Sequence, residues 1–422
     1  MTRQPPLSIR NRRPDHDDLS SALAEKLIGQ DAAIETIAPY VQLYNAGLAV
    51  EGRPVGVFLL LGPTGTGKTR TVEALAEALH GSEKNVLRID CGEFQMEHEV
   101  AKLIGAPPGY LGHRETQPML NQQKLNGVAS DSSSLSIVLF DEVEKAASSL
   151  ARLLLGVLDK ASLKLGDNTQ VNFERSLIFM TSNLGARDML KHMREGFGFS
   201  GLVPSDGRLS AAKLESIALR SARRRFAPEF INRIDCTITY QPLTRAHLER
   251  ILALQLSALK THVQSRLMTR AFDFDLTPPA RDFILEKGTS LESGARELKR
   301  VIHRHLIQPM ASWLVRDAIP PGGWMRFDHQ PGDTELRISS AATRRRLDAA
   351  CSGVTTTRIP PRLVRRRRAR YVTSAKIARL ALDAGNSDQP SDDSRDRAAD
   401  YVGWDLSAGA GAGRSRGSRP EC

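Results

Sequence analysis

The stretch that decides the fold is GPTGTGKT at residues 62–69, directly after the apolar run 55–61. It fits the pattern GxxxxGK[ST], in which a glycine-rich backbone wraps phosphate groups and the next helix points its positive end at them. In such a loop the lysine reaches the outer phosphates and the last hydroxyl ligates Mg²⁺. The residues are Gly62, Pro63, Thr64, Gly65, Thr66, Gly67, Lys68 and Thr69. The stretch therefore predicts a P-loop for a nucleoside triphosphate, with Thr69 as a metal ligand.

Apolar runs typical of buried strands recur on both sides of this loop. They lie at residues 55–61, 86–89, 136–140, 176–180 and 236–240. Helical spacing separates them, for example at Val72, Leu75 and Leu79. Alternation of strands and helices is typical of a parallel sheet with crossover helices. We therefore expect an α/β fold with five parallel strands covered by helices.

The pattern changes after Pro242. Thr244 is placed to cap a helix that carries Leu248, Leu252, Leu256 and Leu259 on one face. Residues 272–276 then alternate as in a strand, a second helix carries residues 298–310, and residues 324–327 and 336–338 are typical of a hairpin. This segment predicts a small α+β domain.

Polar residues end the third and fourth expected strands. Asp141 and Glu142 follow residues 136–140 directly, a position that suits one carboxylate for the magnesium site and the next for polarising an attacking water. The second carboxylate indicates hydrolysis. Asn183 follows the fourth strand. Its amide is suited to orient that water or to sense the outermost phosphate, and a simple helix-capping role is the alternative.

Composition bounds the remaining classes of protein. The chain has 422 residues, 41% of them hydrophobic and 25% charged, which is enough for two folded units. It contains no run of about eighteen apolar residues and no apolar leader, so we expect a cytoplasmic protein without a membrane partner. The four cysteines show no metal-ligand spacing, so magnesium is the only metal expected.

The positive charge is concentrated at one end of the chain. Residues 341–422 hold 17 basic and 9 acidic side chains, a net charge of +8, whereas the whole chain carries +11. We expect four segments: a flexible segment at 1–25, the P-loop domain at 26–242, the small domain at 243–340, and a largely disordered basic tail at 341–422.

Seven separate segments together resemble the Clp-type AAA+ ATPases, in particular the second ATPase module of the ClpA, ClpB and ClpC unfoldases with its small lid domain. They are LIGQDAAI (27–34), GPTGTGKT (62–69), LIGAPPGYLG (103–112), VLFDEVEKA (138–146), MTSNLGA (180–186), FAPEFINRID (226–235) and SGARELKRVI (293–302). The resemblance covers about residues 27–339. It implies ATP as the nucleotide and a homo-oligomeric ring, which we expect to be a hexamer.

The resemblance also implies roles for single residues. Ile28 and Gly29 match the adenine pocket, and Asn183 matches the sensor of the outermost phosphate. Arg233 matches the arginine finger that reaches the nucleotide of the neighbouring subunit, and Arg296 matches the sensor arginine of the small domain. A finger in trans makes hydrolysis depend on assembly, worth about 10³ to 10⁵ in rate in other systems.

Two loops bear on partners. Gly109, Tyr110, Leu111 and Gly112 resemble the pore loop that grips unfolded or aggregated polypeptide, although the following residues 113–117 depart from the family pattern. Phe197, Gly198 and Phe199 loosely match the loop by which some relatives dock on a ClpP-like peptidase.

Three interpretations follow. The first is a protein unfoldase or disaggregase that threads polypeptide through a ring, with or without a ClpP-like peptidase. The second is an AAA+ protein that remodels nucleic-acid complexes through its basic tail. The third is a scaffold that binds nucleotide without hydrolysing it, against which Glu142 and Arg233 argue.

Overall fold

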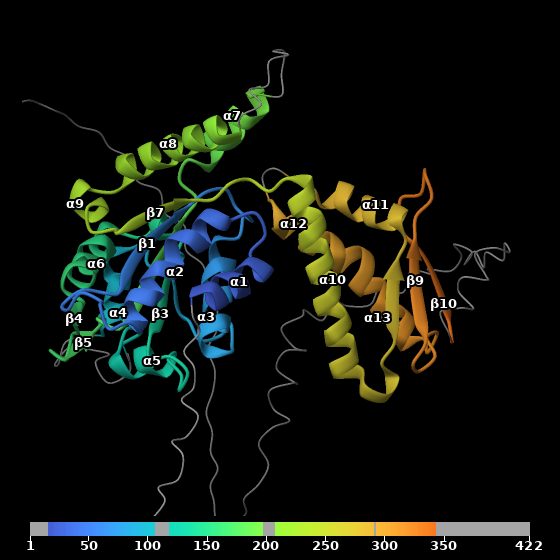
Figure 1. The fold of residues 1–422 in the computed structure, drawn as a ribbon, viewed down its shortest axis with the longest axis horizontal. Helices are drawn as coiled ribbons and strands as arrows, with labels where there is room; N and C mark the ends of the chain where they lie inside the picture. Colours follow the sequence, from blue (N-terminus) through green and yellow to red (C-terminus); the bar gives the residue numbers. More distant parts are fainter. Residues whose placement is uncertain (1–15, 106–117, 197–206, 291–292, 343–422) are drawn as a thin grey trace, which may run out of the picture. The chain divides into compact units, whose positions relative to one another are not determined.

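The computed structural model describes residues 16–105, 118–196, 207–290 and 293–342. They form an α/β domain and, after it in the chain, a smaller α+β domain (Figure 1). Among these residues, no helix has both the length and the hydropathy that a bilayer span requires.

The α/β domain is built on a five-stranded sheet whose paired strands are all parallel. The strands lie in the order β2-β3-β6-β1-β7. They are β1 (Gly56–Leu61), β2 (Leu87–Asp90), β3 (Ser136–Asp141), β6 (Ser176–Ser182) and β7 (Cys236–Thr239). Every residue of β1, β3 and β6 is buried, as expected for strands covered on both faces. The predicted fold class and all five predicted strands are confirmed.

Alternate residues of β1 face two separate hydrophobic layers. Val57 and Leu59 pack in a cluster that includes Leu150 of α6 (Ser148–Lys160). Phe58 and Leu60 pack with α2 (Asp31–Asn45) and α3 (Lys68–His80) in a second cluster. Figure 1 shows these helices on the two sides of the sheet. The remaining helices and 3-10 turns of this domain include η1 (Cys91–Glu93), η2 (Glu97–Val100), α4 (Ala101–Ile104), α5 (Gln122–Gly127), η3 (Val143–Lys145), α7 (Ala186–Gly196), α8 (Gly207–Arg225) and α9 (Pro228–Ile231).

The expectation of a flexible segment at residues 1–25 is wrong for its last part. Helix α1 (His16–Lys26) begins inside it. Leu19 and Leu23 are 2% and 1% exposed and join the cluster formed by α2 and α3. One turn of a helix separates the two leucines, so a short, mostly polar segment still buries a narrow apolar stripe.

A small hairpin was not predicted. β4 (Ser162–Lys164) pairs antiparallel with β5 (Gln170–Asn172), and only Leu163 and Val171 are buried in it. Strands of three residues are too short for an alternating pattern to be recognised.

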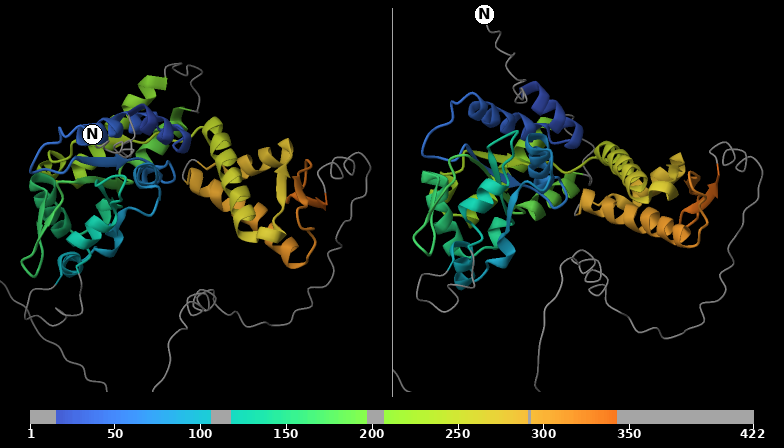
Figure 2. Two further views of the ribbon diagram at one scale, coloured as in Figure 1. Left: turned by 60° about the horizontal axis from the view of Figure 1, so that its bottom comes forward. Right: turned by 90° about the horizontal axis from the view of Figure 1, so that it is seen from below.

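The small domain opens with a capped helix. Thr244 caps α10 (Arg245–Leu267), its hydroxyl accepting a hydrogen bond from the amide of His247 at 3.3 Å. The other elements are η4 (Met268–Arg270), β8 (Asp273–Leu276), α11 (Pro278–Gly288), α12 (Ala295–Ile302), a π-helical turn (His303–Ile307), α13 (Gln308–Val315), β9 (Trp324–Asp328) and β10 (Arg337–Ala341). β8 pairs parallel and β10 antiparallel with β9. Figure 2 shows helices against one face of this sheet, and their apolar side chains form a core of their own.

Sheet topology brings three chain segments to one edge. In the order β3-β6-β1 the carboxyl ends of neighbouring parallel strands lead into Glu142, Asn183 and the P-loop. Ligands of open α/β sheets bind outside these carboxyl ends. The candidate site is therefore expected here.

Candidate functional site

The P-loop joins β1 to α3 and has a backbone that only glycine adopts easily. Gly65 and Gly67 have φ angles of +77° and +108°. A Cβ atom on Gly65 would lie 2.0 Å from the carbonyl oxygen of Ser293, so a larger residue does not fit. The amide of Ala295 donates a hydrogen bond to the Gly65 oxygen at 3.0 Å. The start of α12 therefore touches the phosphate-binding loop.

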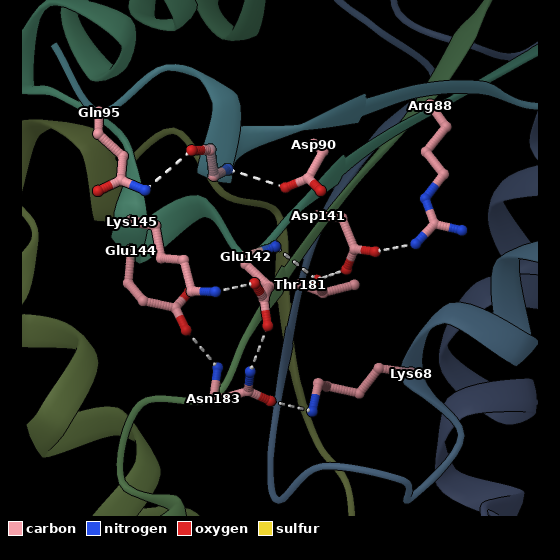
Figure 3. Close-up of polar contacts among 11 residues, drawn as sticks. Lys68, Arg88, Asp90, Gln95, Asp141, Glu142, Glu144, Lys145, Thr181 and Asn183 are labelled. Atoms are coloured by element: carbon pink, nitrogen blue, oxygen red, sulfur yellow. Dashed lines mark hydrogen bonds and ion pairs between the residues drawn. The ribbon is translucent and has the colours of Figure 1, made fainter. Parts of the chain in front are cut away.

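Lys68 lies at the start of α3 and is 8% exposed. Its ammonium donates to the carbonyl oxygens of Gly62 (2.7 Å) and Pro63 (2.9 Å) and to Oδ1 of Asn183 (2.9 Å) (Figure 3). Burial lowers the pKa of Lys68 to about 8, and the positive charge of Arg296 adds to this while Glu144 opposes it. Among the described residues no carboxylate forms an ion pair with this buried ammonium, so its charge can attract a bound anion.

Asp141 at the end of β3 is held by two side chains. One of its oxygens accepts a hydrogen bond from the hydroxyl of Thr181, and the other forms an ion pair with Arg88 of β2. The same Thr181 oxygen accepts a hydrogen bond from the amide of Glu142 at 3.0 Å. Thr181 thus fixes the turn between Asp141 and Glu142 from the neighbouring strand.

Glu142 has an unusual backbone and a carboxylate with a partner on each oxygen. Its φ of +57° lies in the left-handed region, which is uncommon outside glycine and concentrates at functional sites. Oε1 accepts a hydrogen bond from Nδ2 of Asn183 at 3.2 Å, and Oε2 forms an ion pair with Lys145. Figure 3 shows the two contacts converging on the carboxylate.

Asn183 is the residue that connects the P-loop lysine to this carboxylate. Its side chain accepts from Lys68 and donates to Glu142, and its backbone amide donates to Oε1 of Glu144 at 2.9 Å. The side chain makes these contacts instead of capping α7. The geometry favours the sensor interpretation over the capping one.

A cavity of about 1000 Å³ opens beside this constellation. Its lining includes six of the predicted nucleotide-binding residues of the P-loop, Thr64, Gly65, Thr66, Gly67, Lys68 and Thr69. Asp141, Glu142, Asn183 and Arg296 also line it. Gly62 and Pro63 contribute instead the carbonyl oxygens that hold Lys68.

Part of the cavity is lined by apolar side chains. Ile28 lines it together with Leu243, Ile251 and Ala258 of the small domain. The neighbouring Gly29 has a φ of +73°, and a Cβ atom there would lie 2.5 Å from the ring of His247. A planar base could be covered by such aliphatic surface.

The segment before the sheet is tied to the loop by Gln30. Its Nε2 donates to the carbonyl oxygens of Thr66 (3.1 Å) and Gln241 (2.9 Å), and its Oε1 accepts from the Gln241 amide at 3.3 Å. Gln30 is 6% exposed. One buried amide therefore links the approach to α2, the P-loop and the entry to the small domain.

The residues at the site fit magnesium. Thr69 and Asp141 line the same cavity and offer hydroxyl and carboxylate oxygens, the donors that Mg²⁺ prefers. Within the described ranges no group of three or more His, Cys, Asp or Glu residues could hold a metal by itself. Mg²⁺ commonly takes one or two carboxylates and completes its shell with phosphate oxygens and water, which suits this sparse set.

Arg233 lies apart from this cavity. It follows α9, its side chain is 45% exposed, and it forms an ion pair with Asp159 at the end of α6. It is absent from the residues that line the cavity. Of the predicted residues of the nucleotide site, Gly29, Gly62 and Pro63 adjoin residues that line the cavity, whereas Arg233 lies elsewhere.

Two predicted loops fall outside the part of the chain that the structure describes. Gly109, Tyr110, Leu111 and Gly112 lie outside the described residues, as do Phe197, Gly198 and Phe199. Their roles remain predictions.

Sequence reasoning missed four contributors to the site. Gln30 and Lys299 stand inside the family segments at 27–34 and 293–302, but their contacts could not be read from them. Arg88 alternates outward from a short strand, and Lys145 stands inside the family segment at 138–146. In each case the sequence showed only a polar residue inside a predicted strand or a family segment, which did not indicate its contacts.

Comparisons with known proteins agree with this geometry. Residues 53–237 match the family model of the AAA domain (Cdc48 subfamily), and residues 243–327 match the C-terminal, D2-small domain of ClpB protein. The chaperone protein ClpB of Rhodopirellula baltica is 36% identical over 311 residues, 74% of this chain and 33% of ClpB. The negative regulator of genetic competence ClpC/MecB of Bacillus subtilis is 33% identical over 323 residues, 76% of this chain and 38% of ClpC. The chain thus spans little more than a third of the length of these relatives.

Two solved structures have a fold similar to that of this chain. The Saccharomyces cerevisiae Hsp104 complex with casein, in its extended conformation, matches with a TM-score of 0.65 at 25% identity, covering 78% of this chain and 52% of that one. A closed-state reconstruction of Hsp104 with ATPγS and FITC-casein matches with a TM-score of 0.63 at 26% identity, covering 77% and 51%. The chain belongs to the Clp-type AAA+ proteins, and its described residues correspond to a ClpB-like ATPase module with its small C-terminal domain.

Proposed function

We propose that this chain hydrolyses ATP in a homo-oligomeric ring, a hexamer, and uses the hydrolysis to pull unfolded or aggregated polypeptide through the central pore. The observation that carries the proposal is the line of contacts from Lys68 through Asn183 to Glu142. It joins the group that receives phosphate to a carboxylate suited to activate water. A nucleotide-binding scaffold would not need that second group.

The residues have distinct roles in this proposal. Lys68 and the P-loop amides bind the phosphates, and Thr69 and Asp141 hold magnesium. When bound, Mg²⁺ neutralises charge on the phosphate oxygens. Glu142 accepts a proton from the attacking water, which Asn183 orients. When the nucleotide binds, the Lys68 ammonium leaves the carbonyl oxygens of Gly62 and Pro63 and contacts phosphate instead.

Arg233 acts on the neighbouring subunit. Its exposure and its distance from the lining of its own cavity support a role in trans. Arg296 acts on the nucleotide of its own subunit, since α12 is hydrogen-bonded to the P-loop. Together the two arginines stabilise the charge of the transferred phosphoryl group.

The substrate assignment rests on relatives. The matched Hsp104 structures contain casein, and the segment around Tyr110 resembles the family's pore loop. An aromatic side chain on a glycine-flanked loop can pack against many different extended chains. We infer that Tyr110 grips polypeptide without sequence preference.

The test is polypeptide-stimulated hydrolysis. Casein should raise phosphate release by the parent protein, Tyr110→Ala should abolish the stimulation while keeping unstimulated turnover, and Glu142→Gln should retain bound casein in ATP without turnover. Equal stimulation of the parent and of Tyr110→Ala would refute the threading proposal.

The basic tail supports a second candidate, a nucleic-acid remodelling ATPase. Residues 341–422 carry a net charge of +8. Binding through such a tail weakens steeply with salt. Stimulation of hydrolysis by DNA but not by casein would favour this candidate over the first.

Coupling to a ClpP-like peptidase through residues 197–199 is a further refinement of the first candidate, tested by degradation of casein in the presence of the peptidase.

A further inference from the structure

Each oxygen of the Glu142 carboxylate already has a partner. Oε1 accepts a hydrogen bond from Asn183, and Oε2 is paired with the ammonium of Lys145. A general base must offer an oxygen to the water that it deprotonates. In this arrangement the Lys145 ammonium competes with that water for Oε2.

The contact is built into the local backbone. Glu142 caps the 3-10 turn η3, and the Lys145 amide donates to the Glu142 carbonyl oxygen at 2.9 Å. The left-handed φ of Glu142 starts this turn, which returns Lys145 over the carboxylate three residues earlier. Figure 3 shows the Lys145 ammonium against the Glu142 carboxylate, whereas Lys68 contacts Asn183. Lys145 therefore holds one oxygen of the carboxylate from within the same turn, while Asn183 holds the other.

Lys145 has other acceptors nearby. The contact with Glu142, and after it the charges of Asp90 and Glu144, hold the pKa of Lys145 above its ordinary value. Oε2 of Glu144 is buried and accepts no hydrogen bond from any residue in the described ranges, whereas Oε1 accepts from Asn183. A Cβ atom built on Gly92 would lie 3.0 Å from Oδ1 of Asp90 and 3.9 Å from Cδ of Lys145, so the lysine stem and the Asp90 carboxylate lie beside the same glycine. An ammonium that leaves Glu142 thus remains among carboxylates.

We propose that Lys145 is a positioning residue that holds Glu142 in a resting orientation, and that Glu142 becomes available to water when the ammonium moves to the Asp90 and Glu144 carboxylates. The inference deepens the proposed function and rests on the role of Glu142 as the base. It explains why the base is withheld from water between turnovers. No covalent step is added to the reaction.

The expected effect of Lys145 on kcat follows from the solvent exposure of its ion pair with Glu142. The side chains of Lys145 and Glu142 are 49% and 30% exposed, so their ion pair is of the partly solvated kind. Such pairs change equilibria by about two- to fivefold. The ion pair between Lys145 and Glu142, called the latch below, is therefore weak enough to be released in every cycle of hydrolysis.

The experiment compares Lys145→Met, which removes the charge, with Lys145→Arg, which keeps it. Phosphate release is measured against ATP concentration without polypeptide. We expect Lys145→Met to raise kcat about two- to fivefold with KM unchanged, and Lys145→Arg to return kcat toward the parent value. Lys164→Met, a change at an exposed lysine of β4, serves as the matched control. Lys145→Gln, which keeps a polar side chain without charge, replaces Lys145→Met if the latter does not fold.

The outcomes separate two failures. If kcat of both uncharged variants equals or falls below that of the parent while Glu142→Gln is inactive, the latch is refuted and the base assignment stands. If Glu142→Gln retains turnover, the proposed function itself loses its base. A rise in kcat for Lys145→Arg equal to that for Lys145→Met would also overturn the inference, because the charge would then be irrelevant.

Discussion

Replacement of Asn183 by alanine tests the centre of the site. The change removes the acceptor that Lys68 contacts at 2.9 Å and the donor that contacts Glu142 at 3.2 Å. It leaves the backbone amide at this position free to keep its bond to Glu144. The strand and the turn after it should therefore retain their structure.

The magnitude follows from the charge of the two partners. A hydrogen bond to a charged group contributes about 1.5–3 kcal/mol net. If one such bond is made in the transition state, its loss lowers kcat by about 10- to 150-fold. We expect KM for ATP to change less, because Lys68 keeps Gly62 and Pro63 as partners at rest.

The assay is steady-state phosphate release by the parent, Asn183→Ala and Asn183→Asp. The aspartate keeps an acceptor for Lys68 but has no donor for Glu142, so a loss equal to that of alanine assigns the effect to the Glu142 contact. Asn172→Ala, at an exposed position of β5, is the control. A kcat for Asn183→Ala within twofold of the parent would refute the reasoning.

Three further predictions concern binding and stability. The pKa of Lys68 is lowered to about 8, so the free protein loses this positive charge as the pH rises through 8. In a nucleotide titration, the ATP affinity of Glu142→Gln should therefore fall about tenfold between pH 7 and 9. An affinity that does not change with pH would contradict the role of Lys68 in binding phosphate. Tyr240→Phe removes the hydrogen bond from its buried hydroxyl to Thr71 at 2.7 Å and should lower the free energy of unfolding by about 0.5–1.5 kcal/mol, seen as a lower thermal midpoint than the parent's. Gly65→Ala combines a φ of +77° with the contact to the backbone of α12 and should weaken ATP binding at least about tenfold; unchanged affinity would show that the loop relaxes freely.

Much of the fold follows from local sequence because the central strands are buried on both faces. Continuous apolar runs such as that of β1 mark these strands, and polar residues directly after them mark the edge where ligands bind. The P-loop, Asp141, Glu142 and Asn183 could be placed for this reason. Their meeting at one edge required only that the strands be parallel.

The remaining contacts depend on register and on packing between distant segments. Arg88 reaches Asp141 because β2 and β3 pair with Asp90 opposite Asp141, and no local pattern fixes that pairing. Gln30 bonds to a residue 211 positions away. Helix α1 was missed because its few buried leucines are set in a polar segment.

The central claim is that each site of hydrolysis is completed by Arg233 of the neighbouring subunit, and mixing two inactive variants tests it directly. Arg233→Ala keeps its own Glu142, and Glu142→Gln keeps its Arg233. In a ring with head-to-tail contacts, random mixing in equal amounts restores about a quarter of the sites. Replacing Arg233→Ala in the mixture by Arg281→Ala, which changes an exposed arginine of α11, should leave about half of them active. We predict about a quarter of the parent phosphate release for the first mixture, and a mixture no more active than its two components would contradict the account.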